Sequence, residues 1–98
     1  MNISESFKDG VYTVKPDARL DSTTSPELNG LLETKITDAV TALVVDLSLV
    51  DYISSAGLRV FVAAKHLLKA RPIILKNANI SIKDILKMSG LIKLFTVE

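Results

Sequence analysis

The sequence contains no cysteine, one histidine, four glycines and three prolines in 98 residues. Without cysteine, the chain can form neither a disulfide framework nor a thiolate metal site. The single histidine, His66, leaves little for a histidine-based metal centre or catalytic site. We therefore expect no metal ion and no cofactor.

Charge of one sign and long hydrophobic runs are also scarce. The formal net charge is +1, and the lysines fall on expected helix faces rather than among aromatic residues, so nucleic-acid binding is not expected. No apolar run approaches the roughly 20 residues that span a bilayer. The first residues, MNISESFKDG, lack the basic-then-apolar order of a signal peptide. We expect a cytoplasmic protein without membrane insertion.

Apolar residues, by contrast, are plentiful. They make up 48% of the chain, which is enough for the core of one small domain over residues 1–98. Strand-like and helix-like segments alternate after an opening hairpin. The expected fold class is α/β, with a small mixed β-sheet, an opening hairpin, about three helices and right-handed crossovers.

Five segments carry the strand signals. ISESF and VYTVKP predict the two strands of the hairpin, and Asp9-Gly10 between them favours a tight turn. The nearly continuous apolar run TALVVDL, from Thr41 to Leu47, predicts a central strand covered on both faces. RPIILK predicts another strand, and LIKLFTV predicts a last strand-like segment.

The first helix is expected in LDSTTSPELNGLLETKITDAV. Pro26 suits its first turn and Ser25 suits the cap before it, whereas Thr24 with Glu27 offers a competing capping box. Apolar residues recur at helical spacing and predict one buried face: Leu28, Leu31, Leu32, Ile36 and Ala39.

Two more helices are expected in the second half of the chain. The pattern is helical from Ser55 to about Lys69, with one apolar stripe and one polar face. In the segment NISIKDILKMSG, Asn79 suits the helix cap and Gly90 the helix stop.

The segment DYISSAGLRVF, Asp51 to Phe61, lies where the central strand gives way to the second helix. Ligands of open α/β sheets tend to bind at such corners. A phosphoryl group on a serine here would meet free first-turn N–H groups and the positive end of the helix dipole. Simple helix capping is the commoner role of a serine at this position. From the residues alone, both roles remain open for Ser54 and Ser55.

A catalytic role for Ser55 is not supported by its surroundings. The nucleophile elbow requires G-x-S-x-G, and Ile53 stands where the first glycine should be. The only candidate base, His66, lies about three turns along the same helix, roughly 17 Å away. We therefore expect a protein that is not an enzyme. Asp21, in RLDSTTSPEL, is expected to be a loop or turn residue.

Three segments, taken together, resemble the STAS domain, the fold of bacterial anti-sigma factor antagonists. The first is VVDLSLVDYISSAGLRVFVAAKHLL, which resembles the core of the domain. ARLDSTTSPEL resembles the family's G-x-L-D segment, although Ala18 replaces the glycine. ILKMSGLIKLF resembles its late M-S-G-L segment. The three lie in the family's order and span about four fifths of the chain.

The resemblance implies a mechanism of partner switching. An antagonist of this family binds an anti-sigma factor serine kinase and frees a sigma factor; the kinase inactivates the antagonist by phosphorylating one serine, and a serine phosphatase restores it. Aligning Gly57 with the family pattern D-S-[ST]-G-L makes Ser55 the phosphorylated residue. Ser54 then falls on the acidic position and Ala56 on the second hydroxyl.

The resemblance also implies a partner-binding surface and an alternative function. The surface would comprise Asp21, Ser54, Ala56, Gly57 and Arg59, with Asp21 matching the family's loop aspartate. A monomer is expected. Alternatively, the chain could be a STAS subunit of a lipid-transport ATPase complex, in which the same surface serves assembly without phosphorylation.

Overall fold

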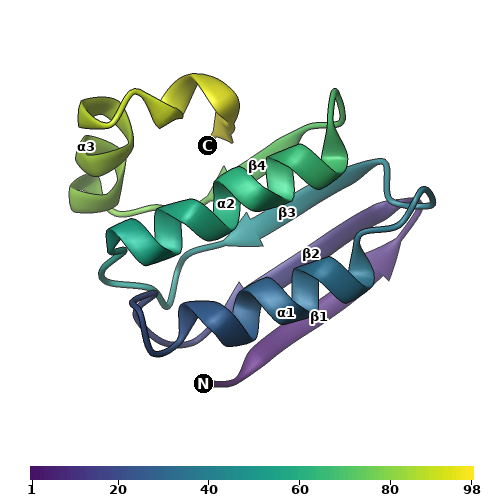
Figure 1. Ribbon diagram of the computed structural model, residues 1–98, viewed down its shortest axis with the longest axis horizontal. Helices are drawn as coiled ribbons and strands as arrows, with labels where there is room; N and C mark the ends of the chain where they lie inside the picture. The colour runs from purple at the N-terminus through teal and green to yellow at the C-terminus, as the bar shows by residue number, and fades with distance from the viewer.

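The computed structural model describes residues 1–98 as a five-stranded mixed sheet with three α-helices (Figure 1). In chain order the elements are β1 (Ile3–Lys8), β2 (Val11–Pro16), α1 (Ser25–Lys35), β3 (Ala42–Asp46), α2 (Ser55–Leu68), β4 (Ile73–Lys76), α3 (Ile80–Met88), the 3-10 helix η1 (Leu91–Leu94) and β5 (Thr96–Val97). The predicted fold class is confirmed.

The strand order in the sheet follows the order in the chain, β1-β2-β3-β4-β5. β1 and β2 form the predicted antiparallel hairpin, and Asp9 (φ 52°) and Gly10 (φ 83°) make its two-residue turn. Positive φ at both positions suits a type I′ turn, which explains the Asp-Gly pair. The remaining neighbours are parallel, and each parallel connection passes through a helix.

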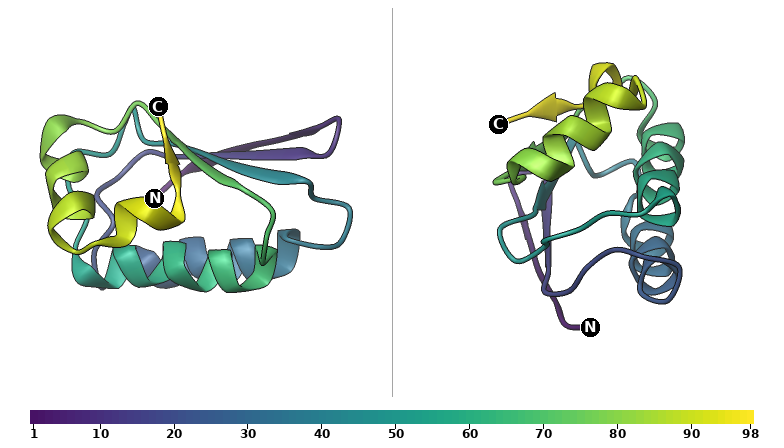
Figure 2. Two further views of the ribbon diagram at one scale, coloured as in Figure 1. Left: turned by 90° about the horizontal axis from the view of Figure 1, so that it is seen from above. Right: turned by 90° about the vertical axis from the view of Figure 1, so that its left-hand side faces the viewer.

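Helices α1 and α2 lie on the same face of the sheet (Figure 2). The core between these helices and the sheet is built from alternate strand residues and the inner faces of the helices. It includes Tyr12, Val14, Leu28, Leu32, Leu43, Val45, Val60, Phe61, Ala64, Leu68, Ile73 and Leu75. Phe61 lies at its centre and meets Phe95 edge-on, with ring centroids 6.1 Å apart.

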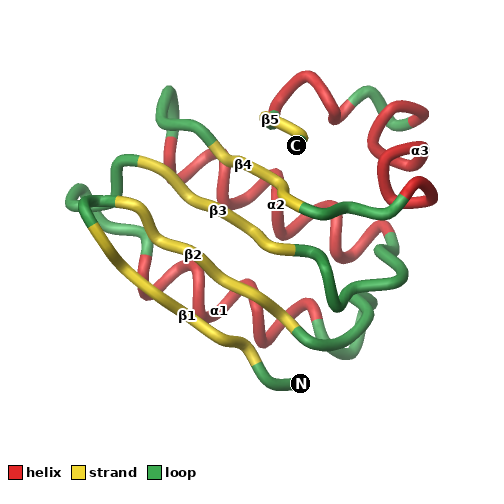
Figure 3. Tube along the Cα trace, turned by 180° about the vertical axis from the view of Figure 1, so that it is seen from behind, coloured by secondary structure: helices red, strands yellow, loops and turns green.

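The opposite face of the sheet has no helix over it, so the prediction that β3 is covered on both faces was wrong (Figure 3). Val44 points to this face and is nevertheless only 7% exposed. Its pairing partners, Thr13 on β2 and Ile74 on β4, flank it. β-branched neighbours on a pleated surface thus bury Val44 without a covering layer.

Of the two predicted caps of α1, Ser25 was wrong, and Thr24 holds the cap position without the predicted side-chain bond. The helix begins one residue earlier, so Ser25 is its first residue, and the cap position belongs to Thr24, whose side chain makes no cap hydrogen bond. The Thr24–Glu27 capping box is therefore not formed. The helix ends at Lys35, so Ala39, predicted to be buried, is exposed beyond it, and Val40 takes its place in the core.

The third helix matches its prediction at both ends, and the segment after it does not. Asn79 caps α3 by accepting a hydrogen bond from the Ile82 N–H (2.8 Å), and Gly90 follows the helix at φ 77°. The predicted strand LIKLFTV is instead the 3-10 helix η1 followed by the two-residue β5. None of the helices combines the length and apolar character needed to cross a membrane.

Candidate functional site

Both α1 and α2 begin at the carboxyl ends of the parallel strands, at the left of Figure 1. There the β2–α1 loop and the β3–α2 loop are joined by a parallel bridge between Leu20 and Ile53. The Leu20 N–H donates to the Tyr52 carbonyl (3.0 Å), and the Ser54 N–H donates to the Leu20 carbonyl (2.8 Å). The bridge brings residues about 30 positions apart in the chain into one site.

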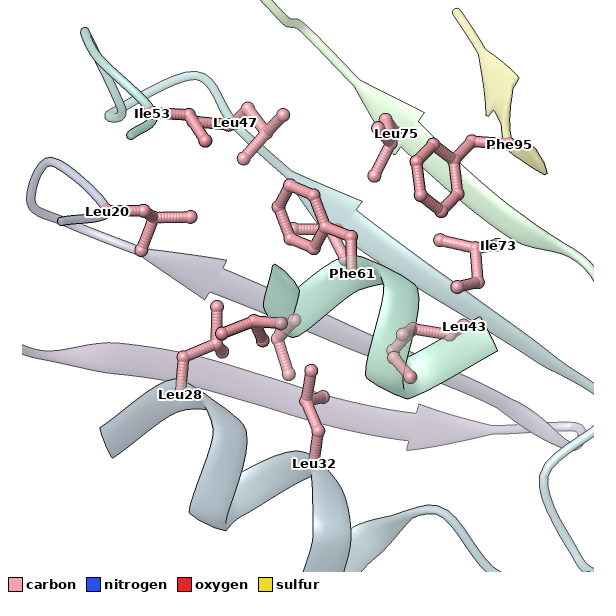
Figure 4. Close-up of a cluster of buried hydrophobic side chains, with 14 of the residues drawn as sticks. Leu20, Leu28, Leu32, Leu43, Leu47, Ile53, Phe61, Ile73, Leu75 and Phe95 are labelled. Atoms are coloured by element: carbon pink, nitrogen blue, oxygen red, sulfur yellow. The ribbon is translucent and has the colours of Figure 1, made fainter. Parts of the chain in front are cut away.

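Apolar packing holds this bridge in place. Leu20 and Ile53 are 0% and 1% exposed, and both belong to the buried cluster around Phe61 (Figure 4). Each loop thus places one large side chain in the core, while the residues beside it stay at the surface. The positions of Asp21, next to Leu20, and of Ser54 and Ser55, after Ile53, are consequently fixed relative to each other.

Ser55 is the first residue of α2 and is exposed to solvent. The first backbone hydrogen bond of the helix runs from the Leu58 N–H to the Ser54 carbonyl (3.0 Å). The N–H groups of Ser55, Ala56 and Gly57 therefore have no acceptor within the helix. The Ser55 hydroxyl is accessible at a point where the backbone favours negative charge.

Ser54 holds the cap position of α2 in extended conformation, but the expected cap bond is missing. Its side chain makes no hydrogen bond, and its Oγ is buried without a partner. The two serines thus differ in access: the hydroxyl of Ser55 faces solvent, and that of Ser54 is turned inward.

Gly57 packs directly against the bridge. A Cβ at this position would lie 2.9 Å from the Leu20 carbonyl oxygen and 2.8 Å from Ile53 Cγ2. Only glycine allows α2 to approach the two loops so closely. Gly57 is buried, so its contribution to a binding surface is the placement of Ser55 and Ala56.

Asp21 holds the turn that leads into α1, which itself has no side-chain cap bond. Its Oδ1 accepts hydrogen bonds from the N–H groups of Thr24 (3.1 Å) and Thr23 (2.9 Å). These bonds, of which the one from Thr24 has the larger effect, hold the pKa of the Asp21 carboxyl below its ordinary value, and Arg19 contributes by its charge. Oδ2 makes no hydrogen bond and stays available.

Sequence reasoning missed several exposed apolar and aromatic residues at this edge. Tyr52 is 42% exposed and stacks under the Arg19 guanidinium, 5.0 Å from the ring centroid. Leu49 and Ile80 are 55% and 77% exposed. Ile80 belongs to the same edge because the Asn79 side chain donates to the Asp51 carbonyl (3.2 Å). The sequence did carry a signal for Ile80, because this residue lies outside the apolar inner face predicted for α3.

The site lacks the groups that hydrolytic chemistry needs. His66 lies near the far end of α2, in its last turn, and Ser55 begins that helix. No three His, Asp or Glu side chains gather as a metal site. What the geometry offers is an exposed hydroxyl, free backbone donors, the carboxylate of Asp21 and the cation of Arg59, which is exposed and makes neither an ion pair nor a hydrogen bond.

Comparison with known proteins identifies a family and similar structures. The family model of the STAS domain matches residues 2–98. An anti-sigma factor antagonist from Mycobacterium paratuberculosis is 27% identical, with a TM-score of 0.87 over 98% of this chain and 83% of that chain. No curated protein matches the sequence significantly.

Two structures of SpoIIAA share the fold at lower identity. The anti-sigma factor antagonist SpoIIAA in its unphosphorylated form is 14% identical, with a TM-score of 0.79 over 99% of this chain and 87% of that chain. The Bacillus cell fate determinant SpoIIAA in its phosphorylated form is 17% identical, with a TM-score of 0.77 over 99% and 91%.

Proposed function

Because the chain belongs to the STAS domain family, we propose that it is an anti-sigma factor antagonist switched off by phosphorylation of Ser55. The observation that carries the proposal is the exposed Ser55 hydroxyl at the first position of α2, beside three N–H groups without a helical acceptor. Its partners would be an anti-sigma factor serine kinase and a serine phosphatase.

The proposed modification needs no rearrangement of the fold. The γ-phosphoryl group of ATP passes to Ser55 Oγ, which loses its proton, and ADP leaves. The product carries about −1.5 to −2 charges at pH 7. The free N–H groups and the helix dipole stabilise this charge in place. The resemblance to both the unphosphorylated and the phosphorylated forms of SpoIIAA supports a local switch.

The partner-binding surface we propose surrounds this serine. Asp21 contributes the free oxygen of its carboxylate, Ala56 a small surface that lets a partner approach, and Arg59 an unpaired cation. Ser54 and Gly57 contribute by holding the start of α2 against the bridge between the two loops. The partner binds this surface when Ser55 is neutral and is repelled when Ser55 carries a phosphate.

Titration calorimetry against the kinase-type anti-sigma factor of the same genome tests the proposal. We expect the unmodified protein to bind and Ser55→Asp to weaken binding at least tenfold. Ser55→Ala should bind as well as the wild type and resist phosphorylation by the kinase. Equal affinity of the wild type and Ser55→Asp would refute the switch. Labelling of Ser55→Ala would move the modified residue elsewhere, with Ser54 the first suspect.

Co-purification from the native host separates this function from the alternative. A soluble serine kinase recovered with the protein supports the antagonist. Recovery of a lipid-transport ATPase instead would favour an assembly role for the same surface.

A further inference from the structure

A hollow of about 460 Å³ lies between the N-terminal halves of α1 and α2. Ser22, Ser25 and Asn29 line it from the side of α1, and Ala56, Arg59 and Val60 from the side of α2. No carboxylate lines it, and the positive ends of both helix dipoles lie beside it. The hollow therefore suits an acidic group.

Ser25 gives an independent indication that a polar group belongs there. The residue is only 3% exposed, and its Oγ has no hydrogen-bond partner in this chain. Buried hydroxyls are nearly always bonded, so one left without a partner in the wall of a hollow is unfavourable until something enters. The Oγ itself is covered in the free chain, so the Ser25 side chain would turn towards the hollow to bond an acceptor brought by another molecule.

Arg59 can serve both the hollow and Ser55. Residues advance by about 100° around an α-helix, so Arg59 lies roughly 40° from Ser55 and 60° from Ala56, between the two. Long helical side chains also lean towards the N-terminus, which directs the guanidinium of Arg59 back over the turn that carries Ser55. Nothing else in the chain holds it.

We propose that Arg59 is a shared cation. In the unmodified protein it pairs with an acidic side chain of the anti-sigma factor that enters the hollow beside Ser25. In the phosphorylated protein it pairs with the phosphoryl group on Ser55. This inference rests on the proposed function and adds a cause to the switch: the phosphate removes a cation from the partner's binding site, in addition to bringing charge.

The pair between Arg59 and the phosphate is testable without a partner. Phosphoserine is inserted at position 55 during translation, and the phosphate is titrated by ³¹P NMR. Its second pKa, ordinarily about 6, should be higher in Arg59→Gln by about half a unit, because a nearby cation favours the dianion. Lys87→Gln, which removes another exposed cation, in α3, should leave this pKa unchanged. Equal titration with and without Arg59 overturns the proposal.

A double-mutant cycle tests the competition. Affinity for the anti-sigma factor is measured for wild type, Ser55→Asp, Arg59→Gln and the double variant. We expect Ser55→Asp to weaken binding about tenfold when Arg59 is present and threefold or less when it is absent. If Ser55→Asp weakens affinity by the same factor with and without Arg59, the charge acts by repulsion alone, which contradicts a shared cation.

Ser25→Ala tests the hollow itself. The substitution removes a hydroxyl that bonds nothing within the chain, and we expect an affinity loss of about threefold. Unchanged affinity would show that no partner group enters. If the anti-sigma factor binds, Ser55→Asp weakens that binding and the cycle is additive, the proposed function stands and only this inference is removed. Absence of any binding refutes the proposed function, while the phosphate titration still decides on Arg59.

Discussion

Single residues decide how closely the two loops and α2 approach each other. The closest approach is at Gly57. Gly57→Ala forces a Cβ to within 3 Å of the Leu20 backbone and of Ile53. We expect it to lower the free energy of unfolding by about 2 kcal/mol, because backbone and a fully buried side chain must both move. Urea unfolding followed by circular dichroism measures the change.

Gly30 provides the matched control, since a Cβ there meets nothing within 4 Å. It lies within α1, where alanine is intrinsically better than glycine by roughly 0.5–1 kcal/mol. Gly30→Ala should therefore stabilise the protein. A Gly57→Ala protein as stable as Gly30→Ala would disprove the close-packing role of Gly57.

Asp21 links the site to pH. Its pKa is lowered by backbone hydrogen bonds from Thr24 and Thr23. Such a carboxyl stabilises the fold above its unfolded value of about 3.9, and this contribution is lost as the pH falls through the lower, folded value. Asp21→Asn keeps an oxygen acceptor but cannot titrate. Between pH 6 and pH 2, the free energy of unfolding of Asp21→Asn should therefore fall less than that of the wild type.

Asp38→Asn is the control for this experiment, because Asp38 is an exposed residue whose side chain makes no hydrogen bond. It should follow the acid sensitivity of the wild type. If the stability of Asp21→Asn falls with pH as much as that of Asp38→Asn, the turn hydrogen bonds of Asp21 do not contribute to stability through the ionised carboxylate.

At the scale of elements, Arg71 joins the α1–β3 loop to the end of α2. Its Nη1 donates to the carbonyls of Thr37 (2.8 Å) and Val40 (2.6 Å), in the α1–β3 loop. Its Nε and Nη2 donate to the carbonyls of Leu68 and Leu67 at the end of α2. One guanidinium thus bonds four carbonyl groups, two in the α1–β3 loop and two at the end of α2.

Replacing Arg71 should loosen this junction. Arg71→Met keeps much of the side chain's length and loses all four hydrogen bonds, so we expect a decrease in the free energy of unfolding of about 2 kcal/mol. Arg59→Met, at an arginine without hydrogen bonds, should change stability by less than about 0.5 kcal/mol. Thermal unfolding of the two variants compares them directly. Equal melting temperatures would contradict the role of Arg71.

Elements whose signals are local were predictable from the sequence. The hairpin followed from Asp9-Gly10 between alternating strands, and α2 from its apolar stripe. The start of α1 was not, because Ser25 is buried as the first helical residue and Asp21, four residues earlier, holds the turn before the helix through the Thr23 and Thr24 N–H groups. LIKLFTV failed for a related reason: its apolar residues pack beside α3 in a 3-10 turn, and only Thr96 and Val97 reach the edge of the sheet.

At the scale of the whole molecule, the sequence identified the residues of the candidate site but not how they meet. The resemblance to STAS domains selected Ser55 and Asp21, and their types suit the chemistry expected of them. The parallel bridge between Leu20 and Ile53, which fixes their positions, depends on tertiary packing that no local pattern carries. Ser25 and the hollow were missed because a buried serine and an expected cap look alike in sequence.

The order of the strands has a consequence for how the chain folds. Each strand pairs with the strand before it, so no pairing has to wait for a segment from the far end of the chain. Contacts that stay close in sequence favour fast folding, because little loop-closure entropy is lost before the contacts form. The β1–β2 hairpin can form first, and each strand–helix unit can add to it as it leaves the ribosome, with β5 closing the sheet last.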